Sequence, residues 1–198
     1  TLWNPVCNWF PSLALVYVGS LVLSQSSVTG PFPHPDFCLG IIVLCHPMPG
    51  HGRAKLDTHY HLPTVTASDA ELEVDLEPFA RLNDAPMGMT SHIVFEAWDA
   101  AHPATLSPVV VERIIRQRIG FDGLLMTDDI DMKALSGTAA DKAAGAIAAG
   151  CDLVLDCWGR MDEMEAIVDR LDEMSPVSSA RLDRAMATVA GVRAEGDV

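Results

Sequence analysis

Three carboxylates stand close together after a short apolar stretch in the second half of the chain. Asp128, Asp129 and Asp131 follow the run Gly123–Thr127 (GLLMT). A short apolar run of this kind predicts a buried strand, so Asp128 would lie at the strand end. Carboxylates this close repel one another and need partners or water. The cluster is therefore either a site with a nucleophilic or metal-binding carboxylate, or a solvated acidic turn that caps the next helix.

A second group of polar residues lies in the segment Pro49–Pro63, whose sequence is PGHGRAKLDTHYHLP. The segment has no hydrophobic periodicity, which predicts a long loop, and long loops in compact domains are commonly functional. Asp57 is two residues from His59, and a carboxylate at that spacing can hold an imidazole in one tautomer. Asp57 and His59 are thus a candidate acid/base pair. The alternative is a set of surface histidines in a polar loop.

Metal binding is a rival interpretation of the same loop. His59 and His61 form an HxH pair, and Asp128 would complete the ligands of a zinc hydrolase. An HxH pair alone is a weak signal, and the cysteines contain no CxxC pair and match no zinc module. Metal binding is therefore kept as the alternative interpretation of this loop. Reduced, buried thiols in a cytoplasmic protein are the default for the five cysteines, which are Cys7, Cys38, Cys45, Cys151 and Cys157.

Three further side chains are candidates for a pocket lining. His92, in the stretch MTSHI, is predicted at a strand end, where it either lines the pocket or is a satisfied core histidine. Trp98 and Trp158 either stack on the flat face of a sugar ring or pack in the core. The sequence leaves both alternatives open for all three residues.

The segments around these residues alternate between strand and helix patterns. Ser68-Asp-Ala-Glu71 is a capping box that opens a helix, and Ser107-Pro108 opens another that ends at Gly120. Strands are expected at Cys38–Leu44, at Met87–Thr90 with a continuation over Ile93–Phe95, at Gly123–Thr127 and at Asp152–Leu155. Further helices are expected at Ala139–Ala149, at about Met161–Glu173 and at about Ser179–Val192.

Strands that alternate with helices at this spacing predict βα units around a parallel sheet, an α/β fold. Polar residues at the C-terminal ends of short buried strands fit a (β/α)8 barrel of the TIM type, in which chemistry collects at that face. About four βα units are present from Cys38 onward, so we expect about the second half of such a barrel. The alternative is a doubly wound open sheet, but no GxGxxG motif follows a strand.

Charge is unevenly distributed along the chain. The net charge of −14 and the pI of about 4.6 argue against a nucleic-acid backbone as partner and favour a small-molecule ligand. Residues 1–52 contain no Lys or Arg and a single acid, Asp36. We therefore divide the chain into an atypical apolar segment, residues 1–45, and a second segment, residues 46–198, with the βα units. Phe10–Leu23 is apolar but shorter than the ~20 residues of a spanning helix, so no membrane segment is expected.

Four stretches, taken in order, resemble one family. The loop PGHGRAKLDTHYHLP is similar to a family loop that reads KHFPGHG…DSH…LP, and MGMTSHIVF with PATLSP is similar to the next strand and loop. IGFDGLLMTDDIDMKALSG and AAGAIAAGCDLVLDCWG follow in register, so the resemblance covers about Pro49 to Gly159. Together they resemble glycoside hydrolase family 3, and within it the bacterial β-N-acetylhexosaminidases of cell-wall recycling.

The resemblance implies a glycosidase that removes terminal non-reducing N-acetyl-β-D-glucosamine with retention, through a covalent glycosyl-aspartate. Asp128 matches the nucleophile, and Asp57 with His59 matches the general acid/base pair. His51 and Gly52 match the loop that carries the pair, and His92 is a pocket candidate. The implied substrates are carbohydrates or muropeptides in the cytoplasm, with no nucleic acid, membrane or cofactor.

The chain departs from the family pattern before the loop. Where the family has Lys-His ahead of PGHG, this sequence has His46 and Pro47, which removes a cation and a donor from the substrate-binding residues. The Asp and Arg that the family supplies upstream are not found in residues 1–45. A truncated product, or a reading frame altered upstream of about Pro47, would explain both features. Half a barrel leaves two open strand edges, so we expect a fragment that self-associates or folds loosely, and an inactive fragment is the alternative function.

Overall fold

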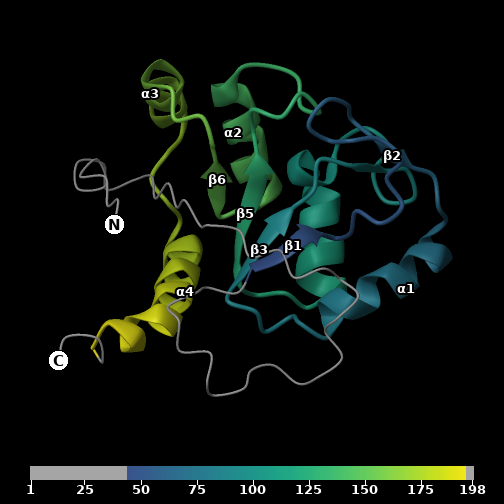
Figure 1. Ribbon diagram of the computed structural model, residues 1–198, viewed down its shortest axis with the longest axis horizontal. Helices are drawn as coiled ribbons and strands as arrows, with labels where there is room; N and C mark the ends of the chain where they lie inside the picture. The colour runs from purple at the N-terminus through teal and green to yellow at the C-terminus, as the bar shows by residue number, and fades with distance from the viewer. Residues whose placement is uncertain (1–43, 195–198) are drawn as a thin grey trace.

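The structure is a computed structural model that describes the backbone of residues 44–194 and the side chains of residues 47–188 (Figure 1). Its centre is a parallel sheet of four strands in the order β1-β3-β5-β6. These strands are β1 (Leu44–Met48), β3 (Met87–Thr90), β5 (Leu124–Asp129) and β6 (Leu153–Leu155). The predicted parallel α/β sheet is confirmed. Phe10–Leu23 and most of the strand expected at Cys38–Leu44 lie outside the described residues.

Helices connect successive strands, as the sequence predicts. Helix α1 spans Asp69–Ala80, and its capping box is formed by Ser68 and Glu71. The short 3-10 turn η2 (Ala104–Leu106) leads into the helix expected after Ser107, η3 (Val110–Arg118), which has the wider turns of a π-helix. Helix α2 is Ala139–Ala149, α3 is Met161–Arg170 and α4 is Pro176–Ala194.

One predicted strand lies in a different sheet from the one expected. Val94–Phe95 (β4) does not continue β3; it pairs in parallel with β2 (Thr64–Val65) in a separate two-stranded sheet. Val94 N donates to the carbonyl oxygen of Pro63, and Glu96 N donates to that of Val65. The end of the long loop is thus hydrogen-bonded to β4. This pairing was not predicted from the sequence.

The sheet has two apolar faces because side chains alternate along each strand. One face carries methionine and leucine side chains from β3, β5 and β6 that pack with residues of α4. Its buried members are Met87, Met89, Leu124, Met126, Leu153 and Ala185. The opposite face, which includes Leu125 and Val154, packs against the helices.

Close packing explains one glycine of the central strands. A Cβ atom on Gly88 of β3 would lie 2.7 Å from the Met48 sulfur and 2.9 Å from the Phe121 ring. Met48 and Phe121 are fully buried, so neither can move without opening the core. The absence of a side chain at Gly88 therefore leaves room for the Met48 and Phe121 side chains in the core.

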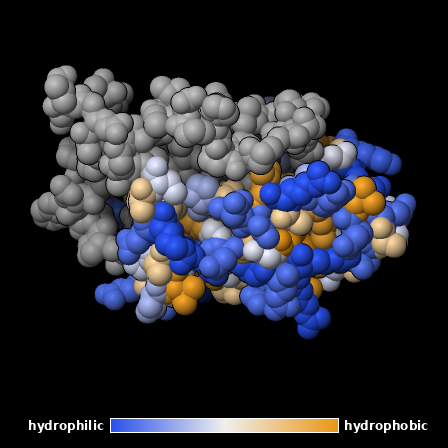
Figure 2. All heavy atoms as spheres, turned by 90° about the horizontal axis from the view of Figure 1, so that it is seen from below, coloured by the Kyte–Doolittle hydropathy of each residue, from blue (hydrophilic) through white to orange (hydrophobic). Residues whose placement is uncertain are grey.

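The outer strands of the sheet and the molecular surface are described next to the core. Among residues 44–194, no further strand pairs with the outer edges of β1 and β6. Within the same residues, no helix is long and apolar enough to cross a bilayer. Figure 2 shows one face on which hydrophilic and hydrophobic side chains are interspersed. The largest exposed apolar residues include Tyr60, Val74 and Trp158.

Candidate active site

The candidate residues lie at the carboxyl ends of the parallel strands, and these ends meet at one edge of the sheet. The loop with Asp57 and His59 follows β1, His92 follows β3, and Asp128 is the penultimate residue of β5. Strand β5 extends two residues further than the apolar run indicates, so Asp128 is held by the strand itself.

Asp57 and His59 form the pair that the sequence predicts. His59 Nδ1 lies 2.7 Å from Asp57 Oδ1, and the same carboxylate oxygen accepts the backbone N–H of His59 at 2.9 Å. These hydrogen bonds lower the pKa of Asp57 below its ordinary value of 3.8. A carboxylate accepts only, so Nδ1 carries a hydrogen and Nε2 is the nitrogen left for proton transfer.

The loop that carries this pair is tied to the segment after β5. The backbone N–H of Lys133 donates to the carbonyl oxygen of His59 at 3.3 Å. The Lys133 ammonium also lies 5.7 Å from the centre of the Tyr60 ring, a cation–π distance. Asp128 is five residues before Lys133, so the acid/base pair and the carboxylate belong to connected parts of one edge.

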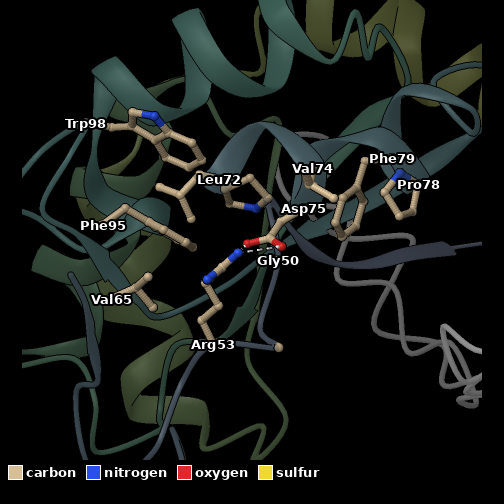
Figure 3. A pocket seen from close by; sticks show the side chains of 12 residues that line it. Gly50, Arg53, Val65, Leu72, Val74, Asp75, Pro78, Phe79, Phe95 and Trp98 are labelled. Atoms are coloured by element: carbon tan, nitrogen blue, oxygen red, sulfur yellow. Dashed lines mark hydrogen bonds and ion pairs between the residues drawn. The ribbon is translucent and has the colours of Figure 1, made fainter. Parts of the chain in front are cut away.

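The base of the loop is anchored on α1. Arg53 Nε and Nη2 both bond the Asp75 carboxylate, and Nη2 also donates to the carbonyl oxygen of Glu71 at 3.1 Å. Figure 3 shows the Arg53 and Asp75 side chains pointing toward one another, with apolar side chains of α1 around them. His51, whose carbonyl oxygen accepts the Ala54 N–H, and Gly52 lie in this stretch, as predicted from the resemblance.

A cavity of about 170 Å³ lies behind this anchor (Figure 3). It is lined by Gly50, Gly52 and Arg53 from the loop, and by apolar residues of α1 and β4 that include Leu72 and Phe95. None of Asp57, His59 and Asp128 lines it. The cavity is therefore a feature of the loop anchor and not the place where the candidate chemistry would occur.

The three carboxylates of the acidic cluster have different partners. Asp129 Oδ1 accepts the N–H groups of Asp131 and Cys157, at 3.1 and 3.3 Å, and Asp131 pairs with Arg160. Asp128 Oδ1 accepts only the neighbouring N–H of Asp129, at 2.8 Å, and its residue is half-buried. Asp129 and Asp131 thus build the turn, and the role of Asp128 as a functional carboxylate stays a prediction.

Of the two alternatives for His92, the structure shows the satisfied core histidine. The residue is 0% exposed, and both of its ring nitrogens have protein partners. Nδ1 lies 2.8 Å from the Thr105 hydroxyl, and Nε2 lies 3.0 Å from the carbonyl oxygen of Asp129. Burial lowers the pKa of His92 below its ordinary value. The ring is therefore part of the protein interior beside Asp128, not an exposed substrate contact.

The two tryptophans and His46 lie in three different surroundings. Trp98 packs: its indole N–H donates to Asp69 at 2.6 Å, and its ring stacks on Phe95 at 4.9 Å between centroids. Trp158 is 70% exposed and lies just after β6. The side chain of His46, in β1, lies outside the described side chains.

The prediction that the cysteines are buried free thiols holds for one of the two cysteines whose side chains are described. Cys151 is a buried free thiol, as expected, whereas Cys157 is a free thiol on an exposed residue. Burial and the charge of Asp129 raise the pKa of Cys157 to about 11. Cys7, Cys38 and the side chain of Cys45 lie outside the described part.

No metal-binding arrangement is formed among the described side chains. No group of three or more His, Cys, Asp or Glu residues is placed there so that it would hold an ion. The rival ligand set of His59, His61 and Asp128 is therefore not assembled in this geometry.

A family model described as the glycosyl hydrolase family 3 N terminal domain matches residues 39–192. The match extends over most of the chain, so the chain belongs to this family. The parallel sheet and its connecting helices agree with the (β/α) barrel type of that domain.

Individual relatives agree with the family assignment. The chain is 42% identical over 142 residues to a beta-hexosaminidase of Chromobacterium violaceum, covering 69% of this chain and 39% of that protein. It matches the structure of a glycoside hydrolase family 3 beta-N-acetylglucosaminidase from Paenibacillus sp. str. FPU-7 with a TM-score of 0.63 and 30% identity, covering 78% of this chain and 31% of the other. NagZ from Neisseria gonorrhoeae in complex with N-trifluoroacetyl-D-glucosamine matches with a TM-score of 0.62 and 28% identity, over 75% of this chain and 50% of that one. The chain thus spans about two fifths of the length of the curated relatives it matches.

Proposed function

We propose that this chain carries the catalytic residues of a β-N-acetylhexosaminidase that hydrolyses terminal non-reducing N-acetyl-β-D-glucosamine residues. The names of the relatives support the substrate class. The observation that carries the proposal is the Asp57–His59 pair on a loop tied, through His59 and Lys133, to the segment that follows Asp128. A nucleophile and an acid/base group on connected parts of one sheet edge are what a glycosidase requires.

The first step forms a covalent intermediate. An Asp128 carboxylate oxygen attacks the anomeric carbon, and the bond from that carbon to the leaving oxygen breaks. The His59 imidazolium gives its Nε2 proton to the leaving oxygen, so the aglycone departs as a neutral alcohol. Asp57, which accepts the Nδ1 hydrogen of His59, orients the ring throughout.

The second step releases the sugar. Neutral His59 takes a proton from water, whose oxygen attacks the anomeric carbon while the bond to Asp128 breaks. Two inversions at one carbon give net retention, so the first sugar product is the β-anomer. His59 ends the cycle protonated, and the carboxylate of Asp128 is restored.

Two finer assignments belong to the same proposal. The aglycone would be an anhydro-muramyl peptide, which makes the reaction a step of peptidoglycan recycling, and the site of action would be the cytoplasm. The free thiols of Cys151 and Cys157 support a reducing compartment. A fusion to a reporter enzyme that is active only after export should stay inactive, and an active reporter would contradict the cytoplasmic assignment.

Self-association through the sheet edges is also proposed. Among residues 44–194, the outer edges of β1 and β6 carry backbone groups that pair with no strand. We expect light scattering of the purified chain to give a mass above the 21.3 kDa of one copy. A monodisperse monomer with a sharp, cooperative thermal transition would contradict self-association.

The glycosidase is tested by release of nitrophenol from 4-nitrophenyl N-acetyl-β-glucosaminide. Activity of the chain that is lost in Asp128→Asn and unchanged by a chelator is the expected result, with the β-anomer as first product in a proton NMR time course. Activity that the chelator abolishes, or that survives in Asp128→Asn, would contradict the proposal. An inactive chain would identify the inactive fragment as the correct alternative.

A further inference from the structure

Two buried donors bond the backbone immediately after Asp128. His92 Nε2 lies 3.0 Å from the carbonyl oxygen of Asp129, and Lys142 Nζ lies 2.9 Å from the carbonyl oxygen of Ile130. His92 is 0% exposed and Lys142 is 9% exposed. Buried polar groups of this kind are costly unless they are bonded, so both contacts are specific features of this edge.

The direction of the His92 hydrogen bond follows from its partner. A backbone carbonyl only accepts, so Nε2 must carry the hydrogen. Nδ1 then lacks a hydrogen in the neutral ring and lies 2.8 Å from the Thr105 hydroxyl, which also donates to the carbonyl oxygen of Ser91 at 3.0 Å. Thr105 Oγ1 in turn lies 2.8 Å from the Thr90 hydroxyl, so the ring lies against a buried chain of hydroxyl groups that starts in β3.

The same stretch is also bonded by β6 and by a residue that follows β6. The Ile130 N–H donates to the carbonyl oxygen of Leu155 at 3.0 Å, and the Asp129 carboxylate accepts the Cys157 N–H at 3.3 Å. The backbone after Asp128 is thus bonded by β6, by the residue that follows β3 and by α2. Among the described residues, the Asp128 carboxylate accepts one hydrogen bond, from the neighbouring N–H of Asp129.

We propose that His92 and Lys142 are positioning residues, which fix the direction of the Asp128 carboxylate through the carbonyl oxygens of Asp129 and Ile130. Neither contacts the reacting atoms. The inference rests on the proposed function of Asp128 as nucleophile, and it assigns His92 a role other than the pocket lining that the resemblance suggested. Lys142, in the alanine-rich helix α2, was not singled out in the sequence at all.

Matched substitutions at His92 distinguish positioning from bulk packing. The amide nitrogen of His92→Gln reaches the place of Nε2, whereas that of His92→Asn reaches only the place of Nδ1. We expect His92→Gln to keep kcat within about 3-fold of the native chain and His92→Asn to lower kcat about 100-fold with little change in KM, because a misplaced reacting group costs about that factor. Lys142→Met should lower kcat more than Lys142→Gln. His102→Gln, at an exposed histidine, is the control and should have no effect.

A readout without turnover separates this inference from the proposed function. The ¹³C signal of the Asp128 carboxyl, assigned with Asp128→Asn, should coincide in the native chain and His92→Gln and move in His92→Asn. Selective ¹⁵N labelling of histidine should show the hydrogen of the His92 ring on Nε2. An Asp128 signal that is the same in all three proteins, or equal losses of kcat in His92→Gln and His92→Asn, would overturn the positioning role. Absence of turnover in the native chain would contradict only the proposed function, since the carboxyl signal still decides the role of His92.

Discussion

The two halves of the candidate site are held in opposite ways. The His59 side chain is 72% exposed, its one described side-chain bond is to Asp57, and a single backbone hydrogen bond ties it to Lys133. Asp128 lies in a strand whose preceding residues are buried, and the backbone after it is bonded from three directions. The proposed acid/base is thus presented by a solvent-exposed loop, and the proposed nucleophile by the sheet.

This difference fits the two roles. A nucleophile attacks one carbon along one line, and about 100-fold in rate depends on its placement within 1 Å. An acid/base group serves two partners in turn, first the leaving oxygen and then a water molecule, so a loop with few bonds suits it. The comparison predicts that substitutions on the sheet side act through placement, and those on the loop side through proton transfer.

After the loss of activity in Asp128→Asn, the largest effect is expected at His59. His59→Ala removes the proton donor, so kcat/KM for a substrate with a poor leaving group should fall by about 10²- to 10⁴-fold. An aryl glycoside with two nitro groups needs little protonation of its leaving oxygen, so its cleavage should lose far less. The ratio of the two losses is measured by parallel assays. Equal losses for both substrates would mean that His59 does not transfer the proton.

The next largest effect is a loss of stability, expected at Asp152 near the amino ends of the strands. Asp152, 5% exposed, accepts Arg116 Nη2 at 2.7 Å and the N–H of Leu125 at 2.9 Å. Asp152→Ala leaves Arg116 buried without its charge partner, so the free energy of unfolding should fall by about 3–5 kcal/mol. Asp122→Ala, at an exposed carboxylate paired with arginines of α4, should cost under about 1 kcal/mol. The free energies of unfolding are measured by denaturant titration. Equal losses in the two variants would show that the buried pair of Asp152 and Arg116 does not stabilise the fold more than an exposed pair.

The pH dependence of Cys157 tests the acidic surroundings of the β5 and β6 ends. Its pKa of about 11 is raised by burial first and by Asp129 second. A raised thiol pKa favours the neutral form below that pH, so at pH 8 about one thousandth is thiolate. Alkylation by iodoacetamide, followed by peptide mass spectrometry, should be slow at pH 8 and rise about tenfold per pH unit. Asp129→Asn should accelerate it, and alkylation at pH 8 as fast as in the denatured chain would contradict the geometry.

The smallest effect is expected at the anchor of the loop. Arg53→Met keeps the aliphatic stem but removes the bonds to Asp75 and Glu71, and an ion pair this accessible to solvent contributes little to global stability. Global stability should therefore change little, while limited proteolysis within residues 50–63 becomes faster. The control is Arg81→Met, which removes an exposed ion pair with Glu77 of α1, the helix that Arg53 contacts. Equal proteolysis of both variants would show that Arg53 does not anchor the loop.

Local patterns predicted much of this architecture. The capping box at Ser68, the strand before Asp128 and the contact of Asp57 with His59 all depend on residues a few positions apart. Sequence spacing determines such features directly, because backbone geometry brings near neighbours together whatever the rest of the chain does.

Other features depend on contacts between distant residues and were not predictable. The bond from His92 to Asp129 joins positions 37 residues apart, and it depends on the register of β3 against β5. The placement of Val94–Phe95 beside β2 likewise depends on where the long loop ends. Lys142 has no local signal, since a lysine in an alanine-rich helix is usually a solvated residue.

The most direct test is to trap the covalent intermediate. A 5-fluoro N-acetyl-β-glucosaminyl donor with an activated leaving group slows release of the sugar, so the glycosyl-enzyme accumulates and its peptides are read by mass spectrometry. We predict one sugar adduct on the peptide that contains Asp128, absent in Asp128→Asn and longer-lived in His59→Ala. An adduct on another residue, or turnover by the chain with no adduct at Asp128, would contradict the assignment of Asp128 as the nucleophile.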